Sequence, residues 1–66
     1  MNIFLNKLKT NVDPGSTLDK LLDEMSIKTK YIAIEVNKQI IPKSEYKKYK
    51  LKHGDKVEIV TAIGGG

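Results

Sequence analysis

Residues 16–25 read Ser-Thr-Leu-Asp-Lys-Leu-Leu-Asp-Glu-Met, and this stretch decides the fold class. Its apolar residues recur at the spacing i, i+3, i+4 and i+7, which places them on one face of an α-helix. They are Leu18, Leu21, Leu22 and Met25. Ser16 and Thr17 supply an N-cap, and Asp19 follows Ser16 by three residues in a variant of the capping box. The stretch therefore predicts an amphipathic helix whose apolar face, Met25 included, packs on a core.

Segments with strand periodicity lie on both sides of this helix. The predicted strands are residues 1–5, 8–12, 31–36, 39–41 and 56–62. Asn6-Lys7 separates the first strand from the second, and Asn37-Lys38 separates the third from the fourth. Each dipeptide predicts a tight hairpin turn. Residues 44–49 predict a helical turn capped by Ser44, with Tyr46 and Tyr49 on one side, where they hold the turn against the core edge.

The order of these elements predicts an α+β domain with one main helix lying across a mixed sheet. Sixty-six residues are enough for one small core and no second domain. We expect residues 1–63 to form this domain. Residues 64–66 are three consecutive glycines, which we expect to form a flexible C-terminal tail.

The composition narrows the function classes. The chain has no cysteine, which excludes disulfides, thiolate metal sites and a cysteine nucleophile. No stretch approaches the roughly 20 apolar residues of a membrane span, and the first residues lack a signal-peptide pattern, so we expect a cytoplasmic protein.

All twelve basic residues are lysine, and the absence of arginine argues against nucleic-acid recognition. Seven of these lysines lie between Lys38 and Lys56. They form either a solvated face or a surface that steers the domain towards an acidic partner.

No group of residues in the sequence predicts an active site. His53 is the sole histidine and lies in a Gly-Asp turn, and the serines have cap or linker explanations without a base at a suitable spacing. Glu35, Glu45 and Glu58 fall on different elements, so no carboxylate pair is set up for acid/base chemistry. Metal ligands are not grouped. We therefore expect a protein that is not an enzyme and that binds no metal or cofactor.

The glycine tail offers the one reactive group that we identify, a terminal carboxylate on Gly66. Three extended glycines reach roughly 10 Å, far enough to enter a narrow cleft in another protein. A carboxylate is a poor electrophile and must be activated, for which adenylation by ATP is the obvious route. Gly64 and Gly65 carry no side chain that would block the cleft. The alternative interpretation is a frayed terminus or a linker scar.

An exposed apolar patch is predicted beside the root of this tail. If alternate residues of the first and last strands point inward, then Phe4, Val60 and Ala62 point outward, and Ile63 precedes the glycines. If the two strands are neighbours, these residues form a protein-binding surface. The alternative is that each is an isolated apolar residue on the surface.

The chain resembles the ThiS family of sulfur carrier proteins from thiamine biosynthesis over essentially its whole length. No single motif is specific, but their order and spacing together are. The matching segments are Met1-Asn2-Ile3, Pro14-Gly15-Ser16-Thr17 with Leu21-Leu22, Ala33-Ile34-Glu35-Val36-Asn37, Ile40-Ile41-Pro42-Lys43-Ser44, His53-Gly54-Asp55 and Gly65-Gly66.

The resemblance implies a ubiquitin-like β-grasp fold and a thiocarboxylate on Gly66. It implies that a ThiF-type enzyme adenylates Gly66 with ATP and magnesium, and that sulfur derived from cysteine, through a donor such as a cysteine desulfurase, displaces the adenylate. A ThiG-type thiazole synthase would then consume the sulfur. Lys43 stands where family members often carry arginine, which puts a bidentate contact there in doubt.

Two other interpretations remain open. The related small subunit of molybdopterin synthase is also a β-grasp carrier that ends in Gly-Gly, although the short chain and the segment 36–42 favour ThiS. From another class, the chain is a β-grasp interaction or nucleic-acid-binding module whose lysine face is the working surface. That module would bind nucleic acid in a salt-sensitive way without Gly65 and Gly66.

Overall fold

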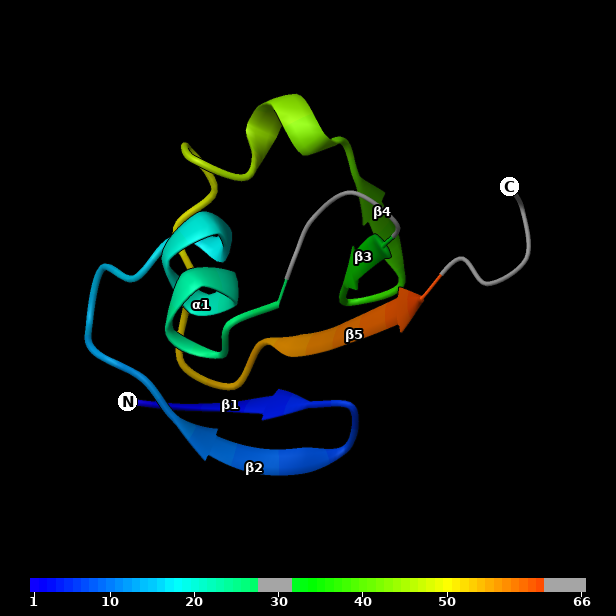
Figure 1. Ribbon diagram of the computed structural model, residues 1–66. Helices are drawn as coiled ribbons and strands as arrows, with labels where there is room; N and C mark the ends of the chain where they lie inside the picture. Colours follow the sequence, from blue (N-terminus) through cyan, green and yellow to red (C-terminus); the bar gives the residue numbers. More distant parts are fainter. Residues whose placement is uncertain (28–31, 62–66) are drawn as a thin grey trace.

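A five-stranded mixed sheet, crossed on one face by a helix, makes up the part of the chain that the computed structural model describes, residues 1–27 and 32–61 (Figure 1). Its elements are β1 (Asn2–Leu5), β2 (Leu8–Asn11), α1 (Leu18–Glu24), β3 (Ile32–Val36), β4 (Gln39–Ile41), the 3₁₀ helix η2 (Lys43–Glu45) and β5 (Lys56–Thr61). The strand order is β2-β1-β5-β3-β4. β1 and β5 run parallel, and the other neighbouring pairs are antiparallel. The predicted α+β fold is confirmed.

Both predicted hairpins form, and their turns explain the register. Asn6 and Lys7 have φ values of 47° and 72°, and Asn37 and Lys38 have φ values of 52° and 70°. Positive φ at both central residues defines a type I′ turn, whose twist matches that of the flanking strands. Asparagine tolerates this conformation better than most residues. Each turn therefore sets the pairing of its two strands locally.

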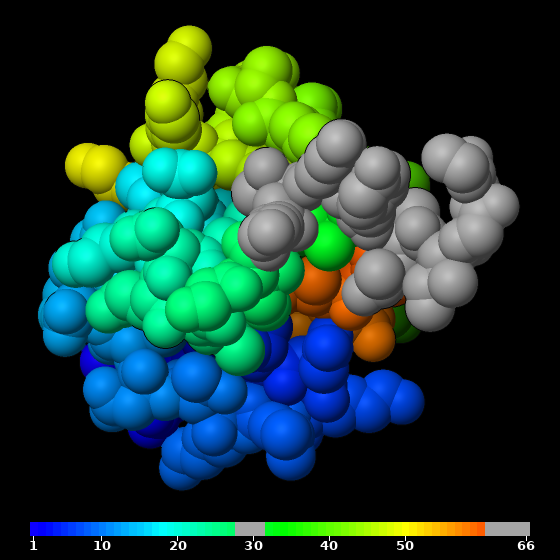
Figure 2. Space-filling model, viewed as in Figure 1, coloured from blue at the N-terminus to red at the C-terminus, as the bar shows by residue number. Residues whose placement is uncertain are grey.

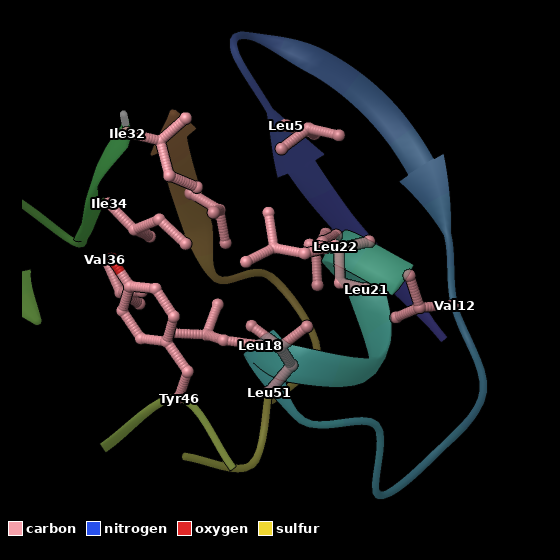
Figure 3. Close-up of a cluster of buried hydrophobic side chains, with 12 residues drawn as sticks. Leu5, Val12, Leu18, Leu21, Leu22, Ile32, Ile34, Val36, Tyr46 and Leu51 are labelled. Atoms are coloured by element: carbon pink, nitrogen blue, oxygen red, sulfur yellow. The ribbon is translucent and has the colours of Figure 1, made fainter. Parts of the chain in front are cut away.

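The core lies between α1 and the inner face of the sheet, where the side chains of Figure 3 point toward one another. In the view of Figure 2, the surface of α1 adjoins that of the β1–β2 hairpin. The buried apolar residues are Ile3, Leu5, Val12, Leu18, Leu21, Leu22, Ile32, Ile34, Val36, Tyr46, Leu51 and Val57. Each fully buried aliphatic side chain contributes about 1.5–3 kcal/mol relative to exposure. Half of this set lies in β1, β3 and β5, where alternate residues point to the same face of the sheet.

Met25 was predicted to lie in the core, and this prediction is wrong. The helix ends at Glu24, and Met25 is the C-cap residue, with its side chain 44% exposed. Ser26 then takes a left-handed conformation, with φ of 56°, which turns the chain away. The periodicity is helical up to Leu22, but the helix is too short to carry a fourth apolar residue into the core.

The helix start also differs from the prediction. Thr17 is the N-cap, and its hydroxyl accepts a hydrogen bond from the Lys20 amide at 3.2 Å. Asp19 is therefore the second helical residue, and the capping box with Ser16 does not form. Ser16 is buried instead, and its Oγ has no hydrogen-bond partner among the described residues.

The predicted helical turn after Pro42 is a 3₁₀ helix, and Ser44 does not cap it. Its N-cap is Pro42, which provides no side-chain hydrogen bond. Tyr46 packs into the core next to Val36 and Leu18 (Figure 3), so its predicted anchoring role is confirmed. Burial raises the pKa of Tyr46, and a hydrogen bond with the backbone of Ile34 lowers it in part.

Tyr46 makes stability sensitive to alkaline pH. The pKa of Tyr46 in the folded chain lies above the ordinary value of 10.0, so the folded chain holds this proton more tightly than the unfolded chain. The stabilisation is complete below about pH 10 and is lost as the pH rises through the folded-state pKa. We expect the free energy of unfolding, measured by urea titration from about pH 8 to about pH 11, to fall less steeply in Tyr46→Phe. An equal decline in both proteins would contradict this assignment.

Candidate functional site

β5 leads into the predicted tail, and it is the central strand of the sheet. β1 lies on one side of it and β3 on the other. It pairs with β3 along five residues, from Val57 to Thr61, but with β1 only at Lys56 and Val57. Thr61 is its last residue. Ala62, Ile63, Gly64, Gly65 and Gly66 lie outside the described residues.

Two asparagine side chains extend the hydrogen bonding of β5 beyond its strand partners. Asn6 Oδ1 accepts the amide of Ile59 at 2.8 Å, past the point where β1 turns away. Asn37 Oδ1 accepts the amide of Lys56 at 3.0 Å, at the start of the strand. Both asparagines are the first residues of type I′ turns, so the turns that fix the two hairpins also fix β5.

Asp55 links the same region to the preceding loop. Its Oδ1 accepts from Asn37 Nδ2 at 3.1 Å, and its Oδ2 accepts the Lys52 amide at 2.8 Å. The carboxylate is nearly buried, with 8% of the residue exposed. Its charge also raises the pKa of Tyr49, although burial is the larger cause. Hydrogen bonds to buried carboxylates are stronger than neutral ones, so the entry into β5 is firmly held.

The predicted patch is divided into two parts by the sheet register. Phe4 and Val60 are both exposed, 38% and 57%, on the face opposite α1, which we call the outer face. However, Phe4 is paired with Lys56, four residues before Val60. Four steps along a strand span about 13 Å, and Glu58 lies between them. The condition that first and last strands are neighbours is met, but Phe4 and Val60 occupy opposite ends of the outer face.

Two further apolar residues, Ala33 and Ile40, are exposed on the neighbouring strands β3 and β4. Ala33 is paired with Val60 and exposed, so the tail end of the face is apolar. Ile40 is 71% exposed and paired with Glu35, which itself faces Glu58. The exposure of Ile40 was not predicted, because a strand of three residues is too short to show which side its alternation buries.

His53 has a structural role in the turn before β5. Its Nδ1 accepts the Asn2 amide at 3.2 Å, while the Gly54 amide donates to the Asn2 carbonyl at 2.7 Å. The side chain is exposed and fixes the N-terminal end of β1 to the turn. This use of the imidazole agrees with its prediction as a turn residue rather than a base.

The described residues provide neither a cluster of metal ligands nor a membrane-spanning helix. In residues 1–27 and 32–61, no group of three or more His, Asp or Glu side chains is placed to hold a metal ion. Within the same residues, no helix is both long and apolar enough to cross a membrane.

The lysine-rich segment does not line a single hollow. Lys38 and Lys56 line one beside Phe4, on the outer face. Lys48 lines a separate hollow with Tyr49 and Pro42. The sequence clustering of lysines therefore reflects two distinct surfaces.

Comparisons with known proteins agree on one family. The family model described as ThiS family matches residues 3–66. A sulfur carrier protein ThiS from Bacillus subtilis is 37% identical over 59 residues, covering 89% of this chain and 88% of that protein. A thiazole synthase from Paramagnetospirillum magneticum is 38% identical over 66 residues. The chain spans about a fifth of the length of the thiazole synthases that it matches.

The fold is also found in a solved relative. A crystal structure of a thiamine biosynthesis protein (ThiS) from Geobacter metallireducens superimposes with a TM-score of 0.87 at 26% identity and covers all of both chains. This match confirms the expected ubiquitin-like β-grasp fold.

The hydrogen bond from Ile59 to Asn6 gives a direct test of how β5 is held. Asn6→Gly retains easy access to positive φ but loses the acceptor. We expect its free energy of unfolding, measured by urea titration, to fall by about 1 kcal/mol. Asn11→Ala is the matched control, because Asn11 Nδ2 donates only a long, exposed bond of 3.4 Å to Asn2 Oδ1. Equal stability of Asn6→Gly and the unmodified chain would show that the Asn6 side chain does not support β5.

Proposed function

The chain belongs to the ThiS family, and on that premise we propose that it is a sulfur carrier of thiamine biosynthesis whose Gly66 carboxylate is converted to a thiocarboxylate. The observation that carries the proposal is the extent of the family match, residues 3–66, which includes all three terminal glycines. The B. subtilis relative, named a sulfur carrier, supports the same role. A carrier acts as a co-substrate of other enzymes and is not itself an enzyme.

The proposed chemistry takes place on Gly66 in two steps. A carboxylate oxygen of Gly66 attacks the α-phosphorus of ATP, and pyrophosphate leaves, which gives an acyl adenylate. In the second step the terminal sulfur of a donor persulfide attacks the carbonyl carbon and AMP leaves, which gives an acyl disulfide. A thiol then attacks the donor sulfur of the S–S bond and supplies the two electrons: the donor leaves as a mixed disulfide with that thiol, and Gly66 keeps the other sulfur as a thiocarboxylate. At neutral pH the starting carboxylate is ionised, since its ordinary pKa is roughly 3.3–3.7, so it reacts only after activation.

This chemistry requires different roles for the folded domain and the glycine tail. We propose that residues 1–63 form the domain that partners recognise and that Gly64, Gly65 and Gly66 form the part that enters the active site. Glycines present no side chain to the walls of a narrow channel. The anchoring of β5 by Asn6 and Asn37 supports this proposal, because it fixes the strand from which the tail starts.

The partners follow from the same proposal. A ThiF-type enzyme would use ATP and magnesium to form the adenylate, and a donor such as a cysteine desulfurase would supply the sulfur. A ThiG-type thiazole synthase would accept it. The last assignment is supported by proteins named thiazole synthase, in which a stretch similar to this whole chain occupies a fifth of the length. We propose a cytoplasmic location, because the adenylation step consumes ATP. ThiS-named relatives favour this role over that of a molybdopterin-synthase subunit.

We further propose that the apolar end of the outer face contacts the activating enzyme. Val60 and Ala33 are exposed and paired at this end, one residue before the last described position of β5. We include Ala62 and Ile63, which follow in the sequence, and Phe4 at the far end of the same face. Apolar patches beside a reactive group commonly mark protein-binding surfaces.

The tail proposal is tested by intact mass. After incubation with ATP, magnesium, a ThiF-type enzyme and a sulfur donor, we expect the mass increase of one oxygen-to-sulfur exchange, located on the C-terminal peptide. Deletion of Gly65 and Gly66 is expected to abolish the exchange while leaving the circular dichroism spectrum and thermal midpoint unchanged. Gly64→Ala serves as the conservative tail control. An unmodified mass under conditions where a known family member reacts would refute the proposed function.

The contact surface is tested separately by kinetics. Val60→Asp is expected to raise the KM for the carrier in the adenylation reaction about tenfold or more, because it puts a charge into an apolar contact. kcat should stay within about twofold. Leu8→Asp is the matched control: Leu8 is 72% exposed but is paired with the inward-facing Leu5, so it lies on the opposite side of the sheet. Equal effects of the two substitutions would argue against a contact at Val60.

A further inference from the structure

A hollow of about 370 Å³ lies on the outer face at the start of β5, at the opposite end of this strand from Thr61. It is lined by Phe4, Lys7, Lys38, Lys56, Val57 and Glu58, which we call the lysine cleft. These residues come from β1, from both hairpin turns and from β5. Ligand pockets typically occupy roughly 300–1,000 Å³, so the lysine cleft has room for one or two side chains rather than an extended ligand.

The charge in the lysine cleft is unbalanced. Three ammonium groups face one carboxylate, that of Glu58. In residues 1–27 and 32–61, none of Lys7, Lys38 and Lys56 forms a salt bridge, whereas Lys20 lies 3.7 Å from Asp13. Exposed lysines normally gain little from pairing, but convergence of three on one hollow produces a local positive potential that attracts an anion.

The backbone sets the positions from which the three lysine side chains extend. Lys7 and Lys38 are the second residues of the two type I′ turns, with φ values of 72° and 70°. The preceding residues, Asn6 and Asn37, restrict the motion of these turns, because their side chains accept hydrogen bonds from the amides of Ile59 and Lys56. β1 and β3 flank β5, and neighbouring strands lie about 4.8 Å apart. A bound group therefore meets three lysines whose backbone positions are set, while their flexible side chains adjust to it.

Phe4 determines what accompanies the anion. Phe4 is 38% exposed and provides an apolar wall in the hollow that the three lysines also line. Ammonium groups are compact point charges that can donate hydrogen bonds to a carboxylate approaching from several directions. An apolar wall beside such charges suits an acidic side chain with an apolar neighbour better than a fully hydrated ion.

We infer that the lysine cleft is a second docking site, which takes an Asp or Glu side chain and an adjacent apolar side chain from the surface of the activating enzyme. This inference rests on the proposed function. Lys56 and Thr61 are separated by five strand steps, about 17 Å. An enzyme that holds the tail and fills the lysine cleft thus contacts both ends of β5, which fixes the direction in which the tail enters its active site.

The test compares two triple substitutions with the same loss of charge. Lys7→Gln with Lys38→Gln and Lys56→Gln neutralises the lysine cleft. Lys47→Gln with Lys48→Gln and Lys52→Gln removes three exposed lysines elsewhere. Pyrophosphate release by the ThiF-type enzyme is measured at about 50 and about 200 mM salt. We expect the cleft triple to raise the KM for the carrier about tenfold at low salt and to flatten its salt dependence, with kcat unchanged and the second triple within about twofold.

Equal KM increases in both triples would mean that net charge alone steers association. No increase in either triple would mean that the lysine cleft is not a docking site. Each result overturns the inference. Release of pyrophosphate with the unmodified chain shows that the adenylation step of the proposed function holds. Its absence would instead refute that function. Amide spectra confirm that both triples are folded.

A titration without any enzyme tests the recognised chemistry. Amide shifts of the ¹⁵N-labelled chain are followed with the peptide acetyl-Glu-Leu-Glu-amide, its Gln-Leu-Gln counterpart, and inorganic phosphate. Saturable shifts around Phe4, Lys7, Lys38 and Lys56 with the acidic peptide alone, lost in the cleft triple, support the inference. Equal or stronger saturation by phosphate would assign the lysine cleft to a small anion and overturn it, as would equal response to the neutral peptide.

Discussion

The parallel pairing of β1 with β5 is the constraint on which the rest of the structure depends. It joins segments about fifty residues apart, yet its strand ladder covers only two residue pairs. Hydrogen bonds outside the ladder lengthen it at both ends. The Asn2 amide donates to His53 Nδ1, and the Ile59 amide donates to Asn6 Oδ1. Between these, the amides of Phe4 and Asn6 donate to Asp55 and Val57 carbonyls at 2.8 Å. Each such bond is worth about 1 kcal/mol net.

This pairing places the N-terminal hairpin and the C-terminal strand in one sheet, and it creates an outer face with a graded composition. Along β5 that face passes from Lys56 through Glu58 to Val60. At the positive end, Lys7 and Lys38 of the two hairpin turns line the same hollow as Lys56. At the apolar end, Ala33 is paired with Val60. A partner surface with the complementary gradient can engage it in only one direction. The sheet thereby orients the strand that leads to the tail.

Periodic sequence patterns predicted much of this structure. In the strands predicted from periodicity, Ile3, Leu5, Ile32, Ile34, Val36 and Val57 are all buried. The predictions that failed depended on where an element ends. Met25 continues the helical spacing, but the chain leaves the helix at Glu24. Ser44 suits a helix cap, but Pro42 begins a 3₁₀ helix instead. Termini depend on packing of the next segment, which local periodicity does not record.

The sequence by itself determined the side-chain alternation of the main strands, the two asparagine turns, the apolar face of α1 and the family resemblance. These are local properties, because a period of two or of 3.6 residues fixes which side chains share a face. Only the tertiary structure decided that Phe4 and Val60 lie at opposite ends of the outer face, and that Lys7 meets Lys38 and Lys56. The register between β1 and β5 sets the first arrangement, and the second also depends on the register between β3 and β5. Both registers arise from hydrogen bonds between residues distant in the chain.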